Sequence, residues 1–192
     1  MAVANKLERS KARKTGLEPA ATRTSQKTGA PVQPFDGSAR STVARGFPVV
    51  GMGASAGGLE AFEQFFTRMP GDCGMAFVLV QHLDPSRTSM MPELLQRFTS
   101  MKVVQAKDRA KAQPNCVYLI PPNKDIIIVN GTLRLTPPVT SHGVRLPIDV
   151  FFRSLAEDQR ERAIGIILSG NGTDGTLGVK AIKEELGMVM AQ

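Results

Sequence analysis

Three polar residues in this sequence have the types and spacing that hydrolysis by an activated serine requires. Ser55 lies among small residues in Gly53-Ala-Ser-Ala-Gly57, and His82 and Asp174 each follow a different apolar stretch. A serine hydroxyl becomes an effective nucleophile when an imidazole accepts its proton. The imidazole in turn needs a carboxylate on its other nitrogen, which fixes its tautomer and stabilises its charged form. The three residues therefore form the set that a hydrolytic triad requires.

Stabilisation of a developing oxyanion needs hydrogen-bond donors close to the serine. Backbone N–H groups at the start of a helix beyond Ser55, at Ala56 and Gly57, can face the negative charge on the substrate oxygen. The glycine-rich loop 170–172 supplies another candidate donor, and Asn171 and Gly172 lie within it. These residues are the predicted lining of the site.

Each member of the set also has an ordinary structural interpretation. Ser55 alone would be a helix cap, His82 a structural histidine near a strand end, and Asp174 a turn residue. Their joint placement at three strand ends favours the catalytic interpretation. His142 lies in a loop between two prolines and is interpreted as a surface residue.

Nucleotide binding is the alternative interpretation of the first glycine-rich segment. Gly51-Met-Gly-Ala-Ser-Ala56 also fits the dinucleotide pattern Gly-x-Gly-x-x-Gly/Ala after a strand. That pattern requires an acidic residue about 20 residues further on, at the end of the second strand. Asp72 lies in a turn before the predicted strand, and Asp84 is too far along the chain. The fingerprint is therefore incomplete.

The elements that position these residues alternate between strands and helices. Apolar runs predict strands at 47–53, 75–80, 102–106, 116–120, 163–168 and 188–190, and helical spacing predicts helices at 58–69, 89–98, 147–160 and 175–186. Asn130-Gly131 predicts a β-hairpin between 125–129 and 132–135. The expected fold is α/β and doubly wound, with a mostly parallel sheet, helices on both faces and the hairpin as an insertion. In such sheets the carboxyl ends of the strands form the functional edge.

Charge is distributed unevenly over the 192 residues. The formal net charge is +7, and residues 1–46 hold nine Lys and Arg against three Asp and Glu. This segment has few large apolar residues, so we expect a disordered basic tail followed by one domain at 47–192. The tail is either a plain solvated leader or a tether to an acidic partner or an anionic membrane surface. The fold itself then carries about one net positive charge, which argues against nucleic-acid binding.

Composition excludes several other classes of protein. No apolar run approaches the length of a membrane span. Cys73 and Cys116 are too few for a disulfide framework and do not form metal-ligand pairs, so they are interpreted as reduced thiols of a cytosolic protein.

Five segments resemble the catalytic domain of the CheB-type chemotaxis protein-glutamate methylesterases, over about residues 47–192. The matching segments are 50–60, Val80-Gln-His-Leu-Asp84, Ile120-Pro-Pro-Asn123, Pro147-Ile-Asp-Val-Phe-Phe152 and Leu168-Ser-Gly-Asn-Gly-Thr-Asp-Gly175. The resemblance implies that Ser55 is the nucleophile, His82 the general base and Asp174 its orienting carboxylate. It also implies hydrolysis of γ-glutamyl methyl esters on the cytoplasmic domains of methyl-accepting chemotaxis receptors, with release of methanol. Some members also deamidate receptor glutamines, and no metal or organic cofactor is implied.

The amino-acid sequences of these motifs are most similar to those of the family branch found at the N-terminus of methylesterase–methyltransferase fusion proteins. This implies a methyltransferase domain or partner. The sequence departs from the family pattern at Ala56, where many members have Thr, and at Asn171, where many have Met. We also expect no phosphorylatable receiver domain within this chain, and a sheet whose C-terminal edge is incomplete. The remaining hypothesis is a non-catalytic remnant that binds receptors or signalling partners.

Overall fold

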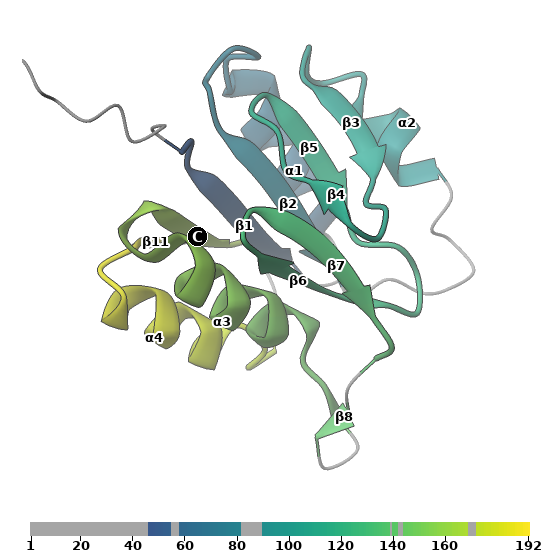
Figure 1. Ribbon diagram of the computed structural model, residues 1–192. Helices are drawn as coiled ribbons and strands as arrows, with labels where there is room; N and C mark the ends of the chain where they lie inside the picture. The colour runs from purple at the N-terminus through teal and green to yellow at the C-terminus, as the bar shows by residue number, and fades with distance from the viewer. Residues whose placement is uncertain (1–45, 55–57, 82–89, 139, 142–143, 169–171) are drawn as a thin grey trace, which may run out of the picture. The chain divides into compact units, whose positions relative to one another are not determined.

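A parallel sheet of six strands lies at the centre of the fold (Figure 1). The structure is a computed structural model and describes residues 46–54, 58–81, 90–138, 140–141, 144–168 and 172–192. The strands are β1 (Val49–Ala54), β2 (Ala76–Gln81), β3 (Lys102–Gln105), β5 (Cys116–Leu119), β10 (Ala163–Ile167) and β11 (Met188–Ala191). Their order across the sheet is β11-β10-β1-β2-β5-β3, and every neighbouring pair is parallel. The predicted parallel sheet is confirmed.

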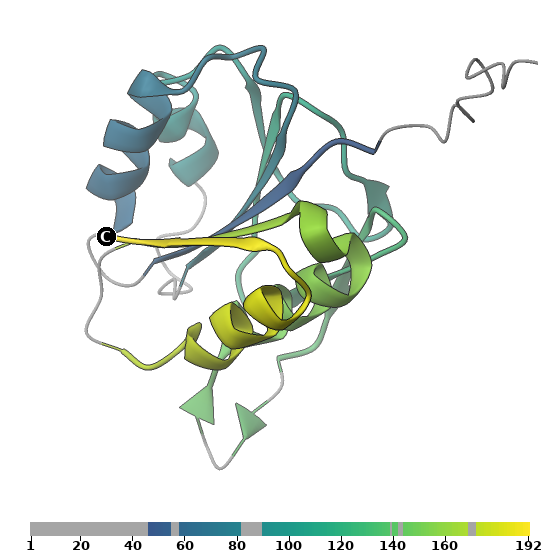
Figure 2. The same cartoon turned by 90° about the vertical axis from the view of Figure 1, so that its left-hand side faces the viewer.

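Helices cover both faces of this sheet, as Figure 2 shows. Helices α1 (Gly58–Arg68) and α2 (Met91–Leu95) pack on one face, while α3 (Pro147–Gln159) and α4 (Thr176–Glu184) pack on the other. Successive side chains of a strand point to opposite faces, so the continuous apolar runs supply two separate cores. Val50 and Met52 of β1 belong to the α1 side, whereas Val49 belongs to the α3 side.

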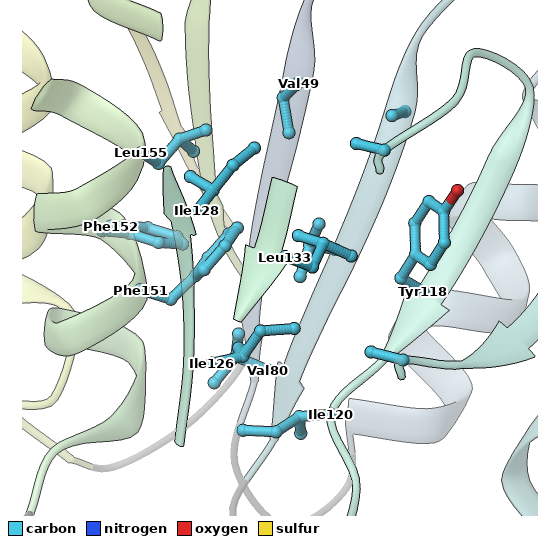
Figure 3. Packing of buried hydrophobic residues seen from close by; sticks show 14 of the residues in the cluster. Val49, Val80, Tyr118, Ile120, Ile126, Ile128, Leu133, Phe151, Phe152 and Leu155 are labelled. Carbon is cyan, nitrogen blue, oxygen red and sulfur yellow. The ribbon is translucent and has the colours of Figure 1, made fainter. Parts of the chain in front are cut away.

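The core between the sheet and α3 is the part of the fold that bears on the site. Phe151, Phe152 and Leu155 of α3 point toward the strands and are fully buried (Figure 3). A fully buried side chain of this size contributes about 1.5–3 kcal/mol to the free energy of unfolding.

Two glycines of β1 let α3 approach the sheet closely. A Cβ atom at Gly51 would lie 2.8 Å from the ring of Phe152, and one at Gly53 would lie 2.6 Å from Cγ2 of Ile148.

The predicted hairpin is present as β6 (Asp125–Val129) and β7 (Thr132–Thr136). Its turn residues Asn130 and Gly131 have φ of 50° and 69°, the positive values that a type I′ turn requires. A short strand β4 (Ala110–Lys111) pairs with β7 and completes a second, three-stranded sheet. The hairpin is fastened to α3, because the amide of Ile128 donates to Oγ of Ser154 over 3.1 Å. It is therefore an insertion that extends the core on the α3 side.

Helix α2 is shorter than the predicted 89–98. It ends at Leu95, and the side chain of Gln96 then bonds to the following segment. Gln96 accepts a hydrogen bond from the amide of Val103 over 3.1 Å and donates to the carbonyl of Met101 over 2.9 Å. These contacts tie the chain to the start of β3 instead of extending the helix.

The sequence did not predict the two-residue strands β4, β8 (Thr140–Ser141) and β9 (Val144–Arg145). A short 3-10 helix at Arg160–Arg162 joins α3 to β10. Within the described parts of the chain, no helix has the length and apolar character needed to cross a membrane. Residues 1–45, which hold nearly all of the predicted tail, and His142 lie outside the described residues.

Candidate active site

The carboxyl ends of three adjacent strands lie level with one another at one edge of the sheet. Ala54, the last residue of β1, pairs in register with Gln81, the last residue of β2. On the other side of β1, Gly53 pairs with Ile167, and the amide of Leu168 donates to the carbonyl of Gly53 over 2.9 Å. The segments that follow these three strands therefore leave the sheet from neighbouring positions.

Most of the predicted site residues fall within those segments. Ser55 directly follows Ala54, and His82 directly follows Gln81. Ser55, His82 and the predicted lining residues Ala56, Gly57 and Asn171 lie outside the described residues, so their roles remain predictions. The structure describes Ala54 and Gly58 on either side of 55–57, Gln81 directly before His82, and Gly172 and Asp174.

Helix α1 begins in close contact with the end of β1. A Cβ atom at Gly58, the first residue of α1, would lie 2.5 Å from Cβ of Ala54. Only a residue without a side chain fits this approach. The first backbone N–H groups of a helix have no partner within the helix and carry its partial positive charge. The start of α1 therefore brings hydrogen-bond donors to the sheet edge at which β1 ends.

Asp174 lies at the same edge and is held by the first turn of α3. Its Oδ2 accepts a hydrogen bond from the amide of Ile148 over 3.0 Å, and its Oδ1 accepts one from the amide of Asp149 over 2.9 Å. These donors orient the carboxylate, and the helix N-terminus favours its negative charge. A carboxylate has about four acceptor positions. Asp174 can therefore also accept the N–H of an imidazole while it keeps both bonds to α3.

Asp149 supports Asp174 and α4 through hydrogen bonds that the sequence did not predict. Its Oδ1 accepts the amide of Gly178, in α4, over 2.7 Å, and the side chain is buried. The backbone amide of Asp149 thus donates to Asp174, while its side chain accepts a hydrogen bond from α4, the helix that follows Asp174. A carboxylate in the first turn of a helix is common, so its residue type alone did not distinguish it. The partner amide lies 29 residues away along the chain.

The loop that carries Asp174 ends in a tight turn before α4. The amide of Thr176 donates to the carbonyl of Thr173 over 3.2 Å, and Gly175 has a φ of 97°. A side chain is strained at that φ, and a Cβ atom there would also lie 2.6 Å from Cδ1 of Ile167. The turn therefore requires glycine directly after Asp174. Gly172, a predicted lining residue, is exposed at the start of this described segment.

The described end of β2 bears on the nucleotide-binding alternative. The last residue of β2 is Gln81, whose side chain is an amide and not a carboxylate. Asp72 lies in the turn before that strand, as predicted. The acid of a dinucleotide-binding fingerprint is therefore missing from the described end of β2. In the same described residues, no group of three or more His, Cys, Asp or Glu side chains is arranged to hold a metal ion.

Comparison with known proteins identifies the family of the chain. The family model described as CheB methylesterase matches residues 50–192. A protein-glutamate methylesterase/protein-glutamine glutaminase 1 of Dechloromonas aromatica is 32% identical over 157 residues, which are 79% of this chain and 44% of the relative. A protein-glutamate methylesterase/protein-glutamine glutaminase 3 of Pseudomonas syringae pv. tomato is 36% identical over 154 residues, which are 80% of this chain and 46% of the relative. The chain thus spans somewhat less than half the length of these two relatives.

A solved structure shares the fold. The crystal structure of the Thermotoga maritima CheB methylesterase catalytic domain superimposes with a TM-score of 0.68 at 26% sequence identity. The alignment covers 74% of this chain and 78% of that domain. The resemblance to methylesterase–methyltransferase fusion proteins stays a prediction from the motifs.

Proposed function

Because the chain belongs to the CheB methylesterase family, we propose that it is a serine hydrolase that removes methyl groups from glutamyl γ-methyl esters of chemotaxis receptors. Methanol is the first product. Its relatives are also named protein-glutamine glutaminases, so deamidation of receptor glutamines is part of the proposal. The substrates are the cytoplasmic domains of the receptors, which places the enzyme in the cytoplasm. A methyltransferase domain or partner remains a prediction from the motifs.

The proposed reaction divides between the three predicted catalytic residues. Oγ of Ser55 attacks the ester carbonyl carbon while His82 accepts the hydroxyl proton. His82 then gives this proton to the departing methoxide, which leaves as methanol. Water, activated by His82, attacks the acyl-enzyme and releases the glutamate carboxylate together with free Ser55. The carboxylate of Asp174 orients the imidazole and stabilises its charged form.

The observation that carries this proposal is the way Asp174 is fixed at the sheet edge. Two amides from the start of α3 hold both carboxylate oxygens, at 3.0 and 2.9 Å. The carboxylate lies at the same edge as Ala54 and Gln81, the residues directly before Ser55 and His82. A base-orienting carboxylate needs this kind of rigid support, because catalysis depends on the geometry of the three groups.

The direct test is methanol release from a methylated receptor fragment. Wild type is compared with Ser55→Ala and with Asp174→Asn, and release should fall by several orders of magnitude in Ser55→Ala. Asp174→Asn keeps the side-chain size and should lower kcat by roughly 10⁴-fold, as expected when the imidazole is left in the wrong tautomer. Thr67→Ala is a suitable control, since Thr67 is exposed and its hydroxyl donates to the carbonyl of Glu63 in the preceding turn of the same helix. It should release methanol at the wild-type rate.

A fluorophosphonate probe separates the proposal from its alternatives. Labelling of wild type and absence of labelling in Ser55→Ala would support a serine hydrolase. Equal labelling of both proteins, or stable receptor binding without methanol release, would refute it. The second result would favour the non-catalytic receptor-binding hypothesis.

A further inference from the structure

A small cavity opens next to the candidate active site, on the side of β2. Its volume is about 90 Å³, and its walls include Gln81, the loop 121–124, Arg145 and Pro147. Two of these residues are directly connected to the site. Gln81 immediately precedes His82, and Pro147 immediately precedes Ile148, whose amide holds Asp174. A group bound in the cavity would therefore lie beside a substrate bound at the strand ends.

Arg145 gives this cavity its chemical character. Its Nη2 donates to Oδ1 of Asp125 over 3.2 Å and to the carbonyl of Lys124 over 3.3 Å. Its Nε is buried and, among the described residues, has no hydrogen-bond partner. Buried donors of this kind are nearly always paired in folded proteins. The side chain is 37% exposed, so part of the guanidinium can be reached from solvent.

The charge at the cavity favours an anion. Asp125 is 1% exposed and offsets one positive charge, since its carboxylate pairs with Arg145. Lys124 also borders the cavity, and the described lining contains no acidic side chain. One net positive charge thus remains for a ligand. The planar fork of a guanidinium matches a carboxylate, which can accept two of its N–H groups at once.

We propose that Arg145 and this cavity form a subsite for a side-chain carboxylate of the receptor, next to the methyl ester that is hydrolysed. The inference rests on the proposed function and adds a preference for acidic receptor segments. The cavity volume suits a single small group such as a carboxylate and excludes a helix or a nucleotide. Because Nε is buried, the carboxylate would accept hydrogen bonds from the part of the guanidinium that is reached from solvent. Arg145 would bind the substrate at a distance from the reacting atoms, so it would affect KM more than kcat.

The test compares two methylated receptor fragments that are identical except that the other Glu side chains of one are replaced by Gln. Wild type should have a KM roughly ten- to hundredfold lower for the acidic fragment, as expected for a hydrogen bond between charged groups. Arg145→Lys keeps a positive charge for Asp125 but lacks the planar fork of the guanidinium, and it should lose most of this discrimination. Lys102→Gln is the control, because it removes an exposed positive charge at the first residue of β3, away from the carboxyl ends of the strands. This variant should keep the wild-type discrimination between the two fragments.

Truncation of Arg145 alone would leave the buried carboxylate of Asp125 without this partner. The double variant Asp125→Asn/Arg145→Gln therefore serves as the second test, because it removes both charges together. It should show the same loss of discrimination as Arg145→Lys while it unfolds cooperatively. If both variants discriminate as well as wild type, the subsite is refuted.

Glutarate binding, measured by calorimetry, tests the subsite without catalysis. Wild type should bind this dicarboxylate at least tenfold more tightly than Arg145→Lys. Equal affinities would overturn the inference. A wild type that hydrolyses neither receptor fragment but binds glutarate through Arg145 would refute the proposed esterase activity and leave the carboxylate site standing.

Discussion

Replacement of Gly53 by alanine tests whether the contact between β1 and α3 sets the position of Asp174. Gly53 lies one residue before the end of β1, under the first turn of α3. A Cβ atom there would lie 2.6 Å from Cγ2 and 2.9 Å from Cδ1 of Ile148. Ile148 is also the residue whose amide donates to Oδ2 of Asp174. The added methyl group therefore pushes directly on a residue that holds the carboxylate.

The size of the effect follows from these distances. Ordinary carbon contacts begin near 3.4 Å, so the Cβ and Cγ2 atoms must separate by 0.8 Å. Overpacking of a core by one methyl group costs about 1–3 kcal/mol of unfolding free energy. A displacement near 1 Å in catalytic geometry can lower the rate by about 100-fold. We expect Gly53→Ala to lose about 1–3 kcal/mol of stability and between ten- and a hundredfold in kcat.

Urea unfolding and methanol release measure the two effects, and Gly51→Ala is the matched control. A Cβ atom at Gly51 would lie 2.8 Å from Phe152, in the middle of α3 and away from the bonds to Asp174. Gly51→Ala should lower the free energy of unfolding by a similar amount but should lower kcat less than Gly53→Ala does. The double variant Gly53→Ala/Ile148→Ala removes both crowded atoms, so its loss of stability should be smaller than the sum of the single losses. The reasoning is wrong if Gly53→Ala unfolds earlier but keeps wild-type kcat, or if Gly51→Ala loses equal activity.

Variants at three further positions test separate features. Asp149→Ala leaves the amide of Gly178 without its acceptor and should cost about 1–3 kcal/mol in urea unfolding, whereas Asp149→Asn, which keeps an acceptor, should cost less. Burial raises the pKa of Tyr118 above its ordinary value of 10.0, so the tyrosine ionises first in the unfolded chain, and stability should fall as pH rises above about 10. Tyr118→Phe should show a shallower alkaline loss in pH-dependent thermal unfolding, and an identical slope would contradict this. Gly131→Ala places a side chain at φ 69° and should cost roughly 1 kcal/mol without any change in methanol release.

The regular elements of the fold could be predicted because their signals are local. The run 75–80 predicted a buried strand, and β2 spans Ala76–Gln81. Asn130-Gly131 predicted the hairpin turn that the positive φ values confirm. The two-residue strands β4, β8 and β9 gave no such signal, because two residues cannot show a period. The end of α2 depended on bonds from Gln96 to residues beyond the helix.

The residue types of the candidate site could be predicted from the sequence, but the hydrogen bonds that hold Asp174 could not. Strand ends and glycine-rich turns identified Asp174, and the structure places it at the predicted sheet edge. Its donors Ile148 and Asp149 lie 26 and 25 residues earlier in the chain, and no local pattern connects them. The pairing of Arg145 with Asp125 gave no signal for the same reason, since the two residues are 20 positions apart and lie on different strands. Ser55 and His82 remain predictions from their types and spacing.

The amides that bond to Asp149 and Asp174 could also report on the site by NMR spectroscopy. The amide protons of Ile148, Asp149 and Gly178 all point at carboxylate oxygens of Asp174 or Asp149. Their NMR chemical shifts and hydrogen-exchange rates should therefore respond when either side chain moves or binds a proton. These three resonances would report whether the predicted catalytic carboxylate of Asp174 is held by α3. The measurement requires neither substrate nor turnover.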